Sequence, residues 1–406
     1  MSNLDLDPFT PDALRDPHPV FARLRAEAPV HYVESFDVWT VARHPDVVAT
    51  LRDAKTFSSA LGMGELMAGR LDPRQPELER PIEMMGDLRI VIAADPPDHT
   101  KLRRLVSGPF AAREMAHLEP RIRELCDELV DDLLAADEAD LVTQVATPLP
   151  VIVIAEVLGI PSERRTDFKR WSDDMVGGLS GELDLMSRQQ SAFEMFEFFS
   201  QAVTERQANP GDDIISALVS RSSSLEDEQL SVPELVAFCI LLLIAGNETT
   251  TNLVANAAHA FFAHPDQWDL LRKDPSLSGA AVEEALRYDG PVKALLRMPD
   301  HDTQIAGTRI PAGARVMPLF SSANRDEATF PSADVFDINR RPEDHIAFGY
   351  GIHHCLGAPL ARLETRVLLE TLARRVARIE PVGDGLPVAS PILRGWQSVP
   401  VSVTPA

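Results

Sequence analysis

The chain has 406 residues, of which 45% are hydrophobic, so it is long enough to bury a large core. Its 62 acidic and 39 basic side chains give a net charge of −23, which argues against nucleic acid or an anionic membrane as the main partner. Three cysteines without paired spacing indicate a reducing compartment, and the acidic N-terminal segment contains no apolar signal or anchor. We therefore expect a soluble, cytoplasmic protein.

The hydrophobic periodicity is mainly that of helices, and no linker, low-complexity stretch or repeat interrupts it. It predicts helices over Pro19–Glu27, His44–Asp53, Pro97–Phe110, Met115–Ala135, Leu149–Leu158, Arg188–Ala208, Ser231–Ala263, Ser278–Tyr288 and Gly357–Ile379. Strand-like segments are fewer and cover Val30–Val33, Val38–Ala42, Arg297–Ile305, Ala314–Phe320 and Val399–Val403. The predicted fold class is mostly α with small β-sheets near the two ends of the sequence, an α+β arrangement. We expect residues 1–406 to form a single domain.

Two segments, Gly62–Ala94 and Trp171–Leu185, are predicted as loops because both are rich in glycine or proline. Such loops are suited to form a pocket. The first contains four methionines, which fit either a pocket wall or ordinary gap-filling core: Met63, Met67, Met84 and Met85.

The helix predicted over Ser231–Ala263 carries an unusual central turn. It starts at a capping box, Ser231 with Glu234, and extends on the order of 50 Å. Inside it, Gly246 and the threonines 249–251 are poor residues for a helix interior. A loosened turn in a buried helix leaves room for a small ligand such as dioxygen. The alternative is a polar patch at a solvated bend.

Cys355 lies between a glycine-punctuated loop and a helix that starts at Gly357. Glycines permit a tight turn and close approach to a flat group. The first N–H groups of the helix favour a thiolate, which is suited to be an axial ligand of an iron porphyrin. Two alternatives are a buried free cysteine, which fits Cys126 and Cys239 better, and a zinc site. The zinc site would use His353, His354 and Cys355, with His345 as a further candidate, but adjacent residues surround one ion poorly.

The segment FGYGIHHCLGAPLAR, residues 348–362, resembles the heme-binding signature of the cytochrome P-450 family, F-G-x-G-x-H-x-C-x-G-x-x-L-A-R. Nine positions match: Phe348, Gly349, Gly351, His353, Cys355, Gly357, Leu360, Ala361 and Arg362. The resemblance implies a P-450-like fold over the whole chain, heme b as cofactor and Cys355 as the ligand of the heme iron. Without an N-terminal anchor, the chain is similar to the soluble bacterial members.

Residues 245–250 resemble the oxygen-activation motif of the same family, A-G-x-[DE]-T-[TS]. The resemblance implies that Thr249 hydrogen-bonds iron-bound oxygen and that Glu248 relays protons to it. Ala245 would lie beside the heme. Asn247 occupies a variable position, and no role is assigned to it.

Glu284 and Arg287 match the family motif E-x-x-R, and Arg340 is the partner that the resemblance implies. We expect this triad to support the cysteine loop without taking part in catalysis.

The resemblance also implies contacts to the heme propionates and to the substrate. The propionate ligands would be His99, Arg103, Arg297 and His353. The pocket would be lined by Leu241, Ile244, Leu295, Leu296 and Trp396, and the tryptophan would make the cavity small. Plain core packing is the alternative for these five residues.

The family resemblance implies a monooxygenase, a monomer that inserts one atom of O2 into an apolar substrate. Electrons would come from a ferredoxin and its reductase, because the sequence has no flavin, nicotinamide or iron–sulfur motif. We expect the ferredoxin to bind a locally basic surface formed by Lys101, Arg104, Arg113 and Arg366. A peroxide-driven peroxygenase and a non-catalytic heme sensor are the alternatives. The sequence leaves the substrate open.

Overall fold

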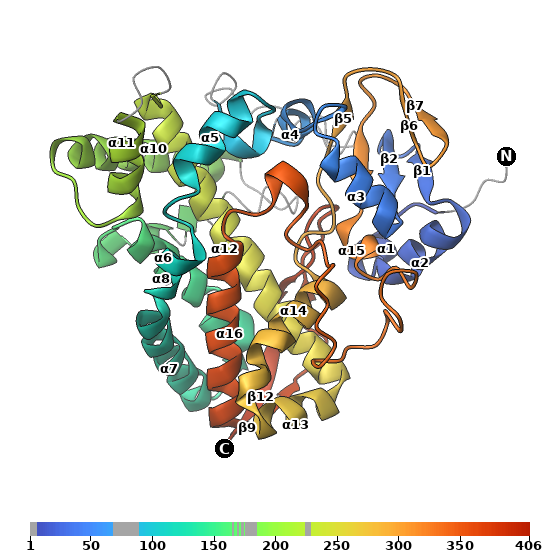
Figure 1. Ribbon diagram of the computed structural model, residues 1–406. Helices are drawn as coiled ribbons and strands as arrows, with labels where there is room; N and C mark the ends of the chain where they lie inside the picture. The colour runs from blue at the N-terminus through green and yellow to red at the C-terminus, as the bar shows by residue number, and fades with distance from the viewer. Residues whose placement is uncertain are drawn as a thin grey trace.

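A 32-residue helix, α12 (Val232–Ala263), runs through the middle of the molecule (Figure 1). The computed structural model describes residues 6–67, 89–164, 166–168, 170–171, 174, 185–223 and 229–406. The predicted capping box is present: the Ser231 N–H donates to Glu234 Oε2 at 2.8 Å, and the Glu234 N–H donates to Ser231 Oγ at 3.4 Å. By length and composition α12 could cross a membrane, but half of its apolar window is buried within the protein. It packs against α8, α10 and α14.

Many helices begin with a proline in the first turn, where a missing N–H costs nothing. This explains how the chain accommodates 32 prolines in a helix-rich fold. The remaining helices are α1 (Pro11–Arg15), α2 (His18–Glu27), α3 (His44–Arg52), α4 (Ser59–Met67), α5 (Asp98–Val106), α6 (Ala112–Ala116), α7 (Glu119–Ala135), α8 (Pro148–Val157), α10 (Leu185–Ala208), α11 (Ile214–Ser223), α13 (Pro265–Lys273), α14 (Ser278–Asp289), α15 (Phe320–Ala323) and α16 (Ala358–Arg375).

The strands form small sheets at the margins of the helical body. They are β1 (Val30–Val33), β2 (Val38–Val41), β3 (Phe57–Ser58), β4 (Ala139–Asp140), β5 (Met298–Pro299), β6 (Thr303–Ile305), β7 (Thr308–Ile310), β8 (Val316–Pro318), β9 (Val376–Pro381), β10 (Leu386–Pro387), β11 (Trp396–Ser398) and β12 (Pro400–Pro405). One sheet has the order β1-β2-β8, with β1 antiparallel and β8 parallel to β2. Another has the order β4-β12-β9 and is antiparallel throughout. Three two-stranded pairs, β3-β5, β6-β7 and β10-β11, complete the set.

Several predicted elements differ from the structure. The helix predicted over 115–135 is two helices, α6 and α7, because a proline starts a new helix in the first turn of α7. The helix predicted over 357–379 ends at Arg375, after which β9 pairs with β12. The strand predicted over 297–305 is divided into β5 and β6. The loop predicted over 62–94 begins inside α4, and its residues 68–88 lie outside the described part of the chain, as do most residues of the loop predicted over 171–185.

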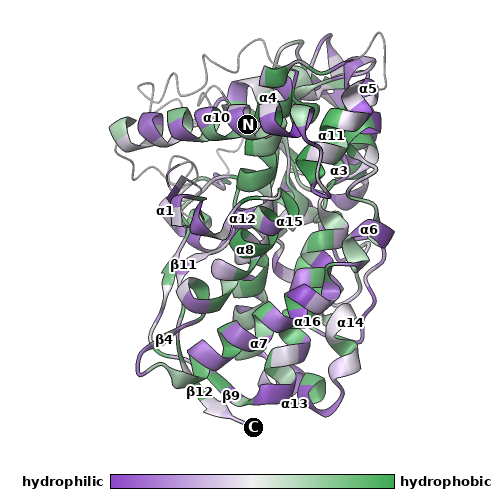
Figure 2. Ribbon diagram, turned by 90° about the vertical axis from the view of Figure 1, so that its left-hand side faces the viewer, coloured by the Kyte–Doolittle hydropathy of each residue, from purple (hydrophilic) through white to green (hydrophobic). Residues whose placement is uncertain are grey.

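The apolar side chains gather in three clusters that hold these elements together. The largest surrounds α12 and includes Cys126 and Cys239, both fully buried as expected of structural cysteines. Figure 2 shows that α8 and α12 are largely hydrophobic, whereas α7 alternates between polar and apolar faces. A second cluster joins α2 to residues 292–296, and a third joins α3 to β2 and β8. The segment that carries Arg297 is therefore anchored from two sides.

Candidate active site around Cys355

The loop before α16 holds Cys355 in a tight turn. Gly349 and Gly351 have φ angles of +71° and +73°, which side chains rarely adopt. The Cys355 N–H donates to the carbonyl oxygen of Phe348 at 2.9 Å. A Cβ at Gly351 would lie 3.0 Å from the carbonyl oxygen of Leu51, so the loop also packs closely on α3. The predicted glycine loop is therefore present, and it fixes the sulfur at the start of α16.

The Cys355 side chain is accessible, although dense protein surrounds it. Burial raises the pKa of its thiol above the usual value, while the N–H of Gly357 and the positive charge of Arg103 oppose this effect. A thiol that faces an internal space is both accessible and surrounded by protein. A cation bound directly to the sulfur would stabilise the thiolate, as axial ligation of a heme iron does.

Gly357 gives a second sign that a bulky group belongs next to the cysteine. A Cβ at this position would meet no described atom within 4 Å, so the surrounding protein gives no steric reason for glycine. The absence of a side chain leaves room for a flat ligand against the loop. The described residues contain no group of three His, Cys, Asp or Glu side chains that could hold a metal ion, so the zinc alternative lacks a ligand set.

The structure brings together the four basic residues that the family resemblance assigns to the propionates. The rings of His99, on α5, and His353 have centroids 4.2 Å apart. Burial, Arg297, His99 and Arg103 together lower the pKa of His353 to about 3. Burial also lowers the pKa of Arg297 to about 10. Arg103 donates from Nη2 to the carbonyl oxygen of His354 at 2.7 Å, which ties α5 to the cysteine loop.

This basic cluster contains nitrogen atoms that could bind anions. In the described part of the chain, His99 Nε2 and His353 Nε2 are buried without a hydrogen-bond partner. Neither Arg103 nor Arg297 forms an ion pair with a described carboxylate. Buried donors and charges without partners are costly, so the cluster is suited to two carboxylate groups. Heme carries two propionates, and these residues fit them.

The central turn of α12 presents the predicted oxygen-activation residues. Thr249 Oγ1 donates to the carbonyl oxygen of Ala245 at 2.7 Å, and Asn252 Nδ2 donates to Glu248 Oε1 at 3.1 Å. Ala245 is exposed, although α12 as a whole lies in the core. The helix remains continuous through Gly246, so the turn is not broken.

The predicted pocket residues divide into two groups. Leu241, Ile244 and Leu295 are half-buried, and Leu296 is fully buried in the second apolar cluster. Trp396 is not brought to Thr249. Its ring stacks on His259 with centroids 3.6 Å apart and an interplanar angle of 7°, ten residues or about 15 Å further along α12. The expectation that this tryptophan narrows the cavity therefore has no support from its position.

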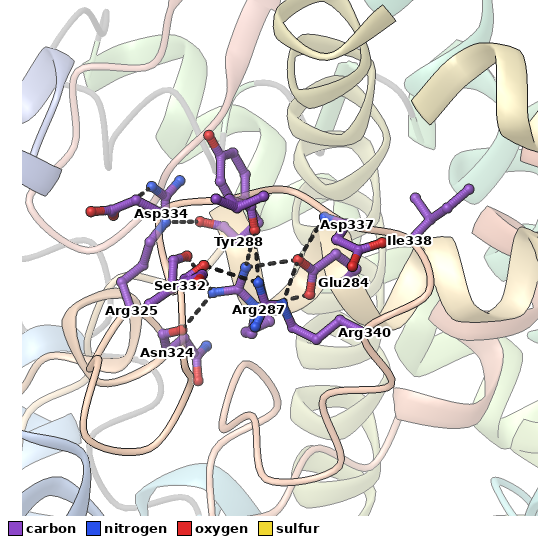
Figure 3. Close-up of polar contacts among 12 residues, drawn as sticks. Glu284, Arg287, Tyr288, Asn324, Arg325, Ser332, Asp334, Asp337, Ile338 and Arg340 are labelled. Carbon is purple, nitrogen blue, oxygen red and sulfur yellow. Dashed lines mark hydrogen bonds and ion pairs between the residues drawn. The ribbon is translucent and has the colours of Figure 1, made fainter. Parts of the chain in front are cut away.

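The Glu284–Arg287–Arg340 triad is assembled in the interior, as Figure 3 shows. Glu284 and Arg287 have 0% exposed side chains and form two hydrogen bonds of 2.8 Å. Arg340 Nε donates to Glu284 Oε1 at 3.1 Å. Arg287 also donates to the carbonyl oxygens of Asn324, Ala333 and Val335. One ion pair thus organises the irregular segment that leads to the cysteine loop.

Sequence reasoning missed Glu283, which braces the cysteine loop from both ends. Its carboxylate accepts from His345 Nε2 at 2.9 Å, before the loop, and from Arg362 Nε at 2.7 Å, after it. Burial acts to raise the pKa of Glu283, but these two partners outweigh it and lower the pKa to about 2. The Arg362 guanidinium also lies 4.4 Å from the ring centroid of Phe348. The sequence signal that could have identified Glu283 was its position directly before Glu284 of the E-x-x-R motif.

Comparisons with known proteins agree with this geometry. Residues 275–377 match the family model described as Cytochrome P450. The chain is 37% identical to the steroid C26-monooxygenase of Mycobacterium tuberculosis, over 97% of this chain and 95% of that protein. The cytochrome P450 CYP109Q5 from Chondromyces apiculatus superposes with a TM-score of 0.88 and 41% identity, covering 98% of each chain. CYP109E1 from Bacillus megaterium, solved in complex with testosterone, has a TM-score of 0.83 and 34% identity over 97% of this chain and 99% of that one. The chain belongs to the cytochrome P450 family and is a heme-binding monooxygenase of the bacterial type.

Proposed function

We propose that this monooxygenase inserts one atom of O2 into an apolar organic substrate, as a cytoplasmic monomer that takes its electrons from a ferredoxin and a ferredoxin reductase. The observation that carries the proposal is the acid–hydroxyl pair on α12, in which Thr249 is bonded to Ala245 and Glu248 to Asn252. Reductive activation of O2 consumes protons, and an acid beside a hydroxyl is an ordered donor route. A peroxide-driven enzyme has no comparable need for this pair.

Each polar group at the site has a defined task. When bound, the heme would supply an iron that activates O2, and the Cys355 thiolate would hold that iron. The Thr249 hydroxyl donates its hydrogen bond to the Ala245 carbonyl oxygen, so the Thr249 oxygen can accept a hydrogen bond from a group bound in the pocket. Rotation of the hydroxyl would let it donate instead, at the cost of one hydrogen bond of about 1 kcal/mol. Glu248 would relay to Thr249 the proton that replaces the one Thr249 gives up.

Electron delivery would use the surface formed by α5, α6 and the start of α16. Bacterial members of the family use redox partners such as ferredoxins. Arg104 is exposed on α5, and α6 contacts α16. Arg113 pairs with Glu114 at 3.1 Å, and Arg366 pairs with Glu119 at 2.6 Å. We expect the exposed Arg104 to contribute to the electrostatic attraction of an acidic ferredoxin.

We propose steroid-sized apolar molecules as the substrate class. One relative is named for steroid oxidation and another was solved with testosterone. The side chains available at the site, Leu241, Ile244 and Leu295, are aliphatic and half-buried, so they can cover a rigid hydrocarbon.

The experiment is a turnover assay with 18O2. The holoenzyme is first screened with testosterone, fatty acids, terpenoids and macrolides for ligands that displace iron-bound water. The ligand with the largest spectral change is then incubated with NADH, a [2Fe–2S] ferredoxin and its reductase. A product that contains one labelled oxygen atom supports the proposal. Product formation with hydrogen peroxide alone, and none with the electron donors, would replace it with the peroxygenase alternative.

A further inference from the structure

One face of α12 carries polar side chains that sequence reasoning did not connect. Glu248, Asn252, Asn256 and His259 are spaced by four, four and three residues, so they lie above one another on the helix. The C-terminal segment 394–396 packs along this face: Gly395 meets Asn252, the Arg394 carbonyl meets Asn256, and Trp396 stacks on His259. The acid of the oxygen-activation motif is therefore at one end of a row of contacts that reaches the C-terminal segment.

Asn252 orients its amide toward Glu248. The side chain is 1% exposed, and its Nδ2 donates to Glu248 Oε1 at 3.1 Å. Its Oδ1 has no hydrogen-bond partner among the described residues. The opposite orientation of the amide would place an oxygen against a carboxylate, which can only accept, so the N–H must face the acid.

Gly395 holds the other side of this amide. A Cβ at Gly395 would lie 1.7 Å from Asn252 Oδ1 and 2.7 Å from Asn252 Cβ. The backbone of Gly395 has no positive φ that would itself require glycine. Glycine is needed here because the Asn252 side chain fills the space that another residue would occupy.

The position of Gly395 is set by a buried anchor at the end of α14. Arg394 Nε donates to Asp289 Oδ2 at 3.1 Å, and the Arg394 N–H donates to the Pro291 carbonyl oxygen at 2.8 Å. Asn256 Nδ2 donates to the carbonyl oxygens of Asp289 and Arg394 at 2.9 and 3.1 Å. Burial acts to raise the pKa of Asp289, but Arg394 and His18 outweigh it and hold the pKa well below its usual range. The anchor therefore stays charged at neutral and alkaline pH.

We propose that Asn252 is a positioning residue for Glu248, and that Gly395 presses its amide into the orientation that donates to Oε1. The proposal rests on the proposed function, since it assigns the role to the proton-donating acid. The hydrogen bond fixes the direction of the carboxyl group without itself transferring a proton. Loss of the bond slows delivery of the protons that are needed to cleave the O–O bond. Reduction of oxygen then shifts from O2 + 4e⁻ + 4H⁺ → 2H2O to O2 + 2e⁻ + 2H⁺ → H2O2.

The first test uses the holoenzyme with NADH, ferredoxin and reductase in the absence of an organic substrate. Hydrogen peroxide released and NADH consumed give the rate of water formation. We expect this rate to fall about tenfold in Asn252→Asp, which keeps the shape but loses the donor, and in Asn252→Leu. Gly395→Ala should have the same effect, and the Leu/Ala double variant should be no worse than either single one. Gly279→Ala is the matched control, because its added Cβ would meet only Arg366 Cδ, at 3.8 Å.

The second test does not depend on turnover. The infrared difference between the protein and its Glu248→Gln variant isolates the carboxylate band of Glu248. We expect Asn252→Leu and Gly395→Ala to shift this band in the same direction, and Gly279→Ala to leave it unchanged. Unchanged bands together with unchanged peroxide yields would show that Asn252 only fills space. If the wild-type protein consumes no NADH, the proposed function fails, and the infrared result still decides the role of Asn252.

Discussion

The hydroxyl of Thr249 donates a 2.7 Å hydrogen bond to the carbonyl oxygen of Ala245, one turn earlier on α12. The bond satisfies the hydroxyl and points its lone pairs away from the backbone. Glu248, the preceding residue, is held by Asn252 one turn later. The hydroxyl is thus oriented by a residue one turn before it, and the carboxyl group by a residue one turn after it. Either side chain can therefore be substituted without removing the hydrogen bond of the other.

Substitution of Thr249 with alanine should uncouple electron consumption from product formation. Without the hydroxyl, protons reach the bound oxygen less efficiently, so product per NADH should fall about tenfold or more while peroxide rises. Thr249→Ser retains the hydroxyl and should stay within about threefold of wild type. Product and peroxide are both measured per NADH. Equal coupling in the alanine and serine variants would remove Thr249 from the proton route.

Substitution of Glu283 with alanine should loosen the cysteine loop. His345 and Arg362 would both lose their carboxylate partner, which should cost about 1–3 kcal/mol of stability. We expect a lower melting temperature and, in the ferrous–CO spectrum, conversion from the thiolate-ligated to the thiol-ligated form. Glu380→Ala, which breaks only the exposed pair with Arg378, is the control. A thiolate-type spectrum as stable as that of wild type would show that the brace is dispensable.

The sequence could predict those site features whose chemistry lies in short, fixed spacings. Cys355 with its glycines, Thr249 with Glu248, and Glu284 with Arg287 are each defined within a few residues, and the structure places all three sets as local geometry requires. The four propionate candidates are distant in sequence. They could be grouped only through the family resemblance, and the fold brings them together.

Features that depend on tertiary packing were not predictable. Glu283 differs from its neighbour Glu284 only in the side of α14 on which it lies, and only the fold shows that His345 and Arg362 meet it. Trp396 was expected at the pocket, but packing of β11 on α12 places it against His259. The end of α16 at Arg375 reflects the pairing of β9 with β12, which local periodicity does not contain.

Charge reversal at Arg104 should impair reduction in a manner that depends on salt. Arg104 is exposed on α5, and the attraction of an acidic ferredoxin falls as the Debye length shortens from about 30 Å at 0.01 M to about 10 Å at 0.1 M salt. Stopped-flow reduction of Arg104→Glu should therefore slow several-fold at low salt and much less at high salt. Arg309→Glu, on β7, controls for the change in total charge. Equal slowing at both salt concentrations would place the docking surface elsewhere.

Glu364, on α16, should make the protein less stable as pH rises. It is 2% exposed, its Oε2 has no partner among the described residues, and burial raises the pKa of its carboxyl to about 8. Between its unfolded pKa near 4.5 and about 8, the folded state binds the extra proton, so its stabilising effect is present at low pH and is lost as pH rises. Glu364→Gln should remove this dependence and stabilise the protein at pH ~8 by a few kcal/mol at most. Urea unfolding at pH ~6 and ~8 measures it; the same pH dependence in both proteins would contradict the assignment.

The most direct test of the account is the ferrous–CO absorbance spectrum of the purified protein and of Cys355→Ser. The basic cluster, the space beside Gly357 and the fixed sulfur support our proposal that Cys355 is the thiolate ligand of a heme iron. We predict the red-shifted band of thiolate-ligated heme in the wild-type protein and its absence in the serine variant, with heme still bound in both. The same band in both proteins, or its absence in the wild type loaded with heme, would contradict the assignment.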